Sequence, residues 1–73
     1  MNTTNLMAKQ EDGGKLIMMD GTIWIVEPNE IHVVGSWDPP CGIQIQEDKA
    51  GQEYDYQIIN LDENTSVSAK KRR

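Results

Sequence analysis

The chain contains one cysteine, Cys41, and one histidine, His32. A single cysteine excludes an intrachain disulfide, which a secreted domain of this size would usually need. A nucleophilic cysteine requires a neighbouring base, but one residue of each type is what chance supplies. With Glu30 and Asp38 as further ligands, the pair also matches no known metal-binding spacing. We therefore predict a protein that is not an enzyme and that uses no metal or cofactor.

Long hydrophobic runs are also missing. The longest, residues 16–19, is far too short to cross a bilayer. The first ten residues lack the apolar centre of a signal peptide. We expect no membrane span and a cytoplasmic protein in a reducing compartment. A chain of 73 residues is long enough for one domain. The stability of so small a domain is marginal unless its core is compact or a partner stabilises it.

Basic side chains are scarce except at the C-terminus. The last four residues carry four of the seven, so residues 1–69 hold three basic and twelve acidic side chains, a net charge of −9. Such a body repels phosphate backbones, whereas the tail Lys70, Lys71, Arg72 and Arg73 attracts them or another anionic surface. Nucleic acid is therefore a disfavoured partner unless the tail acts independently.

What the sequence does contain is a series of short β-prone runs separated by turn residues. Residues 15–19 and 22–27 flank Asp20-Gly21, which predicts a hairpin with a two-residue type I′ turn and Gly21 at positive φ. This register places Leu16 opposite Ile25 and Ile17 opposite Trp24. Leu16, Met18, Ile23 and Ile25 then share one face of the hairpin. Ile17, Met19, Trp24 and Val26 share the other.

Further strands are predicted at residues 30–37, 43–47, 54–61 and 65–69, with a bulge at Gly35. Alternation directs Ile43, Ile45, Val67 and Ala69 inward. The segment 38–42 contains two prolines and is predicted to be an exposed connection. No stretch has a helical period of useful length.

The strand pattern predicts an all-β domain, a small antiparallel barrel of five to six strands and SH3-like size, or a strongly bent meander. Residues 1–14 are predicted to be a flexible N-terminal arm, 15–69 the barrel and 70–73 a basic tail. The motifs Asp20-Gly21-x-x-Trp24 and Tyr54-x-Tyr56 resemble those of small bacterial SH3-like proteins of unknown function. That resemblance implies a small β-barrel and no activity.

Both faces of the predicted hairpin are apolar, and Leu16, Met18, Ile23 and Ile25 already fill a barrel of this size with Ile43, Ile45, Ile58 and Val67. The remaining apolar side chains predict an exposed contact surface. They are Ile17, Trp24, Val26 and Trp37.

The most favoured function is therefore a non-enzymatic protein-binding module or small assembly subunit, with a protein partner or a second copy on this surface. Two alternatives stay open. One is an acidic inhibitor that mimics nucleic acid and occupies a basic groove. The other is a nucleic-acid binder that uses the basic tail and stacks bases on Tyr54 and Tyr56.

Overall fold

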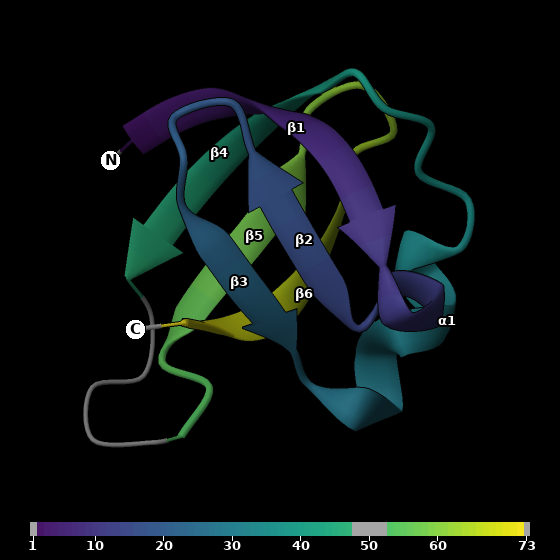
Figure 1. The fold of residues 1–73 in the computed structure, drawn as a ribbon, viewed down its shortest axis with the longest axis vertical. Coiled ribbons are helices and arrows are strands. Elements are labelled where there is room, and N and C mark those ends of the chain that lie inside the picture. Colours follow the sequence, from purple (N-terminus) through teal and green to yellow (C-terminus); the bar gives the residue numbers. More distant parts are fainter. Residues whose placement is uncertain (1, 48–52, 73) are drawn as a thin grey trace.

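The computed structural model describes residues 2–47 and 53–72 as an all-β barrel (Figure 1). Its strands are β1 (Asn2–Gln10), β2 (Lys15–Met18), β3 (Ile23–Val26), β4 (Cys41–Glu47), β5 (Tyr56–Asn60) and β6 (Thr65–Lys71). All neighbouring pairs are antiparallel, and the sheet closes in the order β1-β2-β3-β6-β5-β4. The predicted small antiparallel barrel is confirmed.

The N-terminal segment is a barrel strand rather than the flexible arm that we predicted. β1 pairs with β2 along one edge and with β4 along the other, so it closes the barrel. Leu6 is fully buried, and a bulge at Met7 bends the strand. The single-turn η1 (Glu11–Gly13) then leads into β2. At the other terminus, β6 extends through Lys71, two residues into the predicted tail.

The segment predicted as a third strand instead covers one end of the barrel. Pro28 begins the 3-10 turn η2 (Pro28–Glu30), and α1 (Ile31–Val34) follows directly. Val34 and Trp37 are fully buried, and the Trp37 indole Nε1 donates to Thr65 Oγ1 at 2.9 Å. The β-branched residues of this run favour a strand locally, but packing over the barrel end outweighs that weak preference. The predicted bulge at Gly35 is likewise wrong, because Gly35 follows the helix in an αR conformation.

The β2–β3 hairpin has a three-residue loop, not a two-residue one. Ile17 pairs with Ile23, the Met18 N–H donates to the Thr22 carbonyl, and the Gly21 N–H donates to the Met18 carbonyl. Gly21 has φ +91°, as predicted, but as the left-handed residue that closes a three-residue loop. The extra loop residue shifts the register by one position, which reverses the faces of β3 relative to our prediction.

One continuous core fills the barrel. The inward positions predicted for Ile43, Ile45, Val67 and Ala69 are confirmed by their burial. Cys41 begins β4 and is buried, although its segment was predicted to be an exposed connection. The core residues are Leu6, Leu16, Met18, Trp24, Val26, Val34, Trp37, Cys41, Ile43, Ile45, Ile58, Val67 and Ala69.

Candidate functional site

Three of the four residues predicted to form an exposed contact surface lie in the core. Trp24, Val26 and Trp37 are at most 3% exposed. The register shift turns Trp24 and Val26 inward, and the helical segment carries Trp37 over the barrel end. Of the predicted surface, only Ile17 projects outward, where it is half-buried.

The register that buries Trp24 directs two other isoleucines outward. Ile23 and Ile25 alternate with Trp24 and Val26 along β3 and are half-buried on the outer surface. Ile17 on β2 pairs directly with Ile23. We call Ile17, Ile23 and Ile25 the isoleucine face; it lies on β2 and β3, whose ribbons are in front in Figure 1.

Further apolar side chains extend this face toward β1. Ala8 pairs with Ile17 across the β1–β2 ladder. Met19 follows β2 and is 55% exposed, and Met7 at the bulge of β1 is 53% exposed. The apolar outer surface therefore spans three adjacent strands and is continuous across their ladders.

The outer surface of the other three strands is mostly polar. Inward Ile43 and Ile45 on β4, Ile58 on β5, and Val67 and Ala69 on β6 leave the alternate positions facing outward. The outward residues of these three strands are Gly42, Gln44, Gln46, Gln57, Ile59, Ser66, Ser68 and Lys70. Apart from Ile59 and from Leu61, which follows β5 and is 51% exposed, the apolar outer residues are thus concentrated on β1, β2 and β3.

Cations flank the isoleucine face across the ladders, while Glu27 follows it along β3. Ile25 pairs with Lys15 on β2 and with Lys70 on β6, so both lysines project outward beside it. Beyond Lys71, the Arg72 backbone N–H donates to the Ile23 carbonyl at 2.8 Å. Across the ladders, the neighbours of Ile23 and Ile25 are therefore Ile17 and three basic residues.

The predicted basic tail is divided by the structure. Lys70 Nζ lies 2.7 Å from Glu53 Oε2, and this hydrogen bond raises the pKa of Lys70. Lys71 pairs with the inward-facing Trp24, so it projects toward the barrel mouth rather than beside Lys70. Arg73 lies outside the described residues. The cations of the tail therefore belong to different surfaces.

The two tyrosines also have different environments. Tyr56 is half-buried, and its ring meets the Trp24 ring edge-on with centroids 5.1 Å apart. Tyr54 lies under Lys70, whose Nζ is 5.4 Å from the ring centroid. One ring is thus packed against the core and the other is engaged by a cation.

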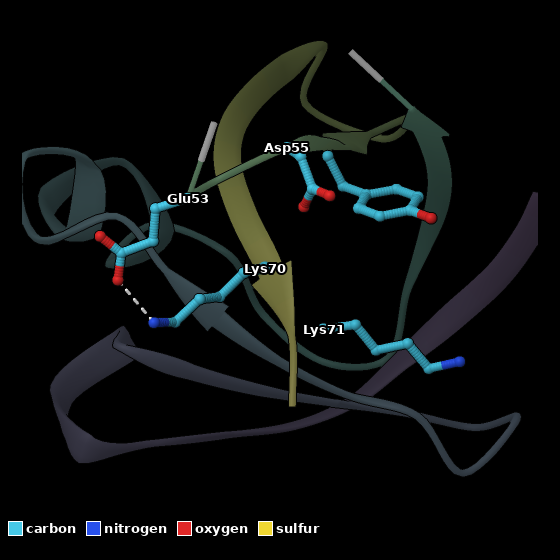
Figure 2. Close-up of a pocket in the computed structure, with 5 residues that line it drawn as sticks. Glu53, Asp55, Lys70 and Lys71 are labelled. Atoms are coloured by element: carbon cyan, nitrogen blue, oxygen red, sulfur yellow. Dashed lines mark hydrogen bonds and ion pairs between the residues drawn. The ribbon is translucent and has the colours of Figure 1, made fainter. Parts of the chain in front are cut away.

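A cavity of about 260 Å³ lies beside the start of β5 and the end of β6 (Figure 2). Figure 1 shows these two strand ends on the side of the barrel away from α1. The residues that line the cavity are Glu53, Asp55, Tyr56, Lys70 and Lys71. In Figure 2 the Glu53–Lys70 ion pair occupies one side, and the Lys71 side chain extends away from it. A lysine amine is ordinarily protonated at neutral pH, and the hydrogen bond to Glu53 raises the pKa of Lys70 further, so Lys70 is unsuitable as a general base.

Cys41 and His32 have unrelated surroundings. Cys41 is buried, and the Asn60 amide Nδ2 donates to its sulfur at 3.5 Å. Burial, and then the carboxylates of Asp62 and Glu63, raise the pKa of the Cys41 thiol. His32 is exposed on α1. A raised thiol pKa disfavours the thiolate that a nucleophile would need.

The other two residues considered as metal ligands are placed separately. The Glu30 carboxylate accepts a hydrogen bond from the Ser68 backbone N–H, and Asp38 is exposed. Within residues 2–47 and 53–72, no three side chains of the types that bind metals come together. No helix in these residues is both long and apolar enough to span a bilayer.

Comparisons with known proteins give no relative: no family model matches the chain, and no curated protein or solved structure matches it.

Proposed function

We propose that this chain is a non-enzymatic protein-binding module and that its contact surface is the isoleucine face. The observation that carries the proposal is the one-sided distribution of outward apolar side chains. Contiguous apolar surface on a small protein commonly marks a contact site. Here it comprises Ile17, Ile23 and Ile25, bordered by Met19 and Met7.

Closure of the barrel restricts how a partner can bind. Each strand pairs with a neighbour on both sides, so a partner cannot add a strand to an open edge. Recognition must depend on side chains of the outer surface. The single buried thiol is consistent with the cytoplasmic location that we include in this proposal.

Site-specific photo-crosslinking in the native cell tests the proposal. A photoreactive amino acid at position 25 should yield a discrete adduct with another protein. The matched control is position 46 on β4, where Gln46 is outward and exposed. Thermal melting of both variants verifies that they fold.

An adduct from position 25 and none from position 46 would support a contact surface on β2 and β3. Equal labelling from both positions, or none from either, would contradict the proposal.

A further inference from the structure

On the basis of the function proposed above, we propose that the partner is a protein segment in which carboxylates flank apolar side chains. The chemistry of this partner follows from the cations around the isoleucine face. Lys15 and Lys70 border Ile25, and Arg72 borders Ile23. A glutamate or aspartate of the partner would lie against one of these cations. An apolar side chain next to it in the partner would cover the isoleucine face.

Lys15 and Arg72 have no carboxylate partner among residues 2–47 and 53–72. In the part of the chain that the structure describes, the one ion pair joins Lys70 and Glu53. Lys15 and Arg72 are therefore available to pair with carboxylates of a partner. Acidic side chains outnumber basic ones in this chain by twelve to seven, so a surface with several basic residues differs from the chain as a whole. Complementary charge at the rim of an interface mainly accelerates association and selects the partner.

A second copy of this chain fits the surface less well. In a twofold-symmetric dimer the same patch meets itself, so the face would be apposed to its own cations. Lys15 and Arg72 would then face like charges, which opposes association.

Nucleic acid also fits less well. A phosphate backbone could contact the cations, but it offers no apolar group to cover Ile17, Ile23 and Ile25. The net charge of −5 adds a general repulsion. An acidic apolar protein segment satisfies both the apolar centre and the basic rim.

The test begins with selection from a displayed library of random peptides against the intact protein. Enriched peptides should combine aspartate or glutamate with branched or aromatic apolar residues. One of them is then synthesised with a fluorophore, and its affinity is measured by fluorescence anisotropy. Raising the salt concentration should weaken its binding, because the rim charges are exposed to solvent.

Two charge reversals provide a matched comparison. Arg72→Glu places a carboxylate beside the isoleucine face, whereas Lys71→Glu makes the same change in charge at the adjacent residue, whose pairing with Trp24 directs it to the barrel mouth. We expect Arg72→Glu, and likewise Lys15→Glu, to weaken peptide binding by about tenfold or more. Lys71→Glu should have a clearly smaller effect.

The contradicting outcomes separate this inference from the proposed function. Failure to enrich acidic peptides, or equal effects of Arg72→Glu and Lys71→Glu, overturns the acidic partner. If the enriched peptides then lose affinity in Ile25→Ser, the contact surface still stands. Peptides that bind equally well to Ile25→Ser contradict the proposed function itself. Competition by single-stranded oligothymidine, or a dimer in sedimentation that Ile25→Ser dissociates, would overturn the inference in favour of nucleic acid or a second copy.

Discussion

Leu16 and Trp24 lie directly opposite each other across the β2–β3 ladder, and both side chains are buried in the core. Residues opposed in an antiparallel pair project to the same face of the sheet. This one pairing therefore places Trp24 in the core and leaves Ile25 outside between Lys15 and Lys70.

Trp24 and Ile25 should differ sharply in their contribution to stability. Trp24→Ala removes a large buried ring and its contact with Tyr56, and we expect it to lower the free energy of unfolding by about 3–5 kcal/mol. Ile25→Ala should lower it by about 1 kcal/mol or less, because Ile25 is only half-buried. Urea denaturation of both variants measures the difference, and equal losses would contradict the register.

Gly21→Ala should destabilise the hairpin through the backbone alone. A Cβ at Gly21 would meet no atom within 4 Å, but the φ of +91° is unfavourable for alanine. We expect a loss of about 1 kcal/mol in the free energy of unfolding. The control is Gly42→Ala in β4, where φ is ordinary and the nearest contact is 3.7 Å. That variant should be neutral or slightly more stable, and thermal melting of the pair checks both expectations.

The N-terminal strand should be required for folding. Leu6→Ala empties a fully buried position and should cost about 2–5 kcal/mol in the free energy of unfolding. Met7→Ala, one residue away and largely exposed, should change it by about 0.5 kcal/mol or less. Chemical denaturation distinguishes them. Small effects of both substitutions would indicate that β1 contributes little to the barrel.

The Cys41 thiol should make stability depend on alkaline pH. Burial raises the pKa of Cys41 in the folded chain, so the unfolded chain loses this proton first as pH rises above the ordinary thiol pKa of about 8.5. The contribution of Cys41 to stability is therefore complete below that pH and declines above it. The gap in unfolding free energy between the wild type and Cys41→Ala should shrink across this range.

Thiol reactivity provides a second measurement on the same residue. A disulfide reagent should modify Cys41 much more slowly in the folded protein than in denaturant, because burial limits access and disfavours the thiolate. A native rate equal to the denatured rate would show that Cys41 is accessible in the folded chain.

Local sequence determined the class of this fold and much of its core. Alternation in β4 and β6 was sufficient to place Ile43, Ile45, Val67 and Ala69 inward, because side-chain direction in a strand has a strict period of two. Gly21 marked the hairpin because it tolerates positive φ. Patterns of this kind depend only on neighbouring residues.

Tertiary structure determines three features that local patterns do not: the helix at residues 31–34, the strand β1 and the inward face of β3. Residues 30–37 have strand-forming side chains, yet over the barrel end residues 31–34 form α1, and Val34 in this helix and Trp37 after it are buried. β1 is mostly polar, but Leu6 and the edges of β2 and β4 hold it in place. The length of the β2–β3 loop determines which side chains of β3 face the core, because a shift of one residue exchanges all inward and outward side chains. The isoleucine face therefore follows from strand pairing, a long-range interaction, and could not be read from the composition of β3 alone.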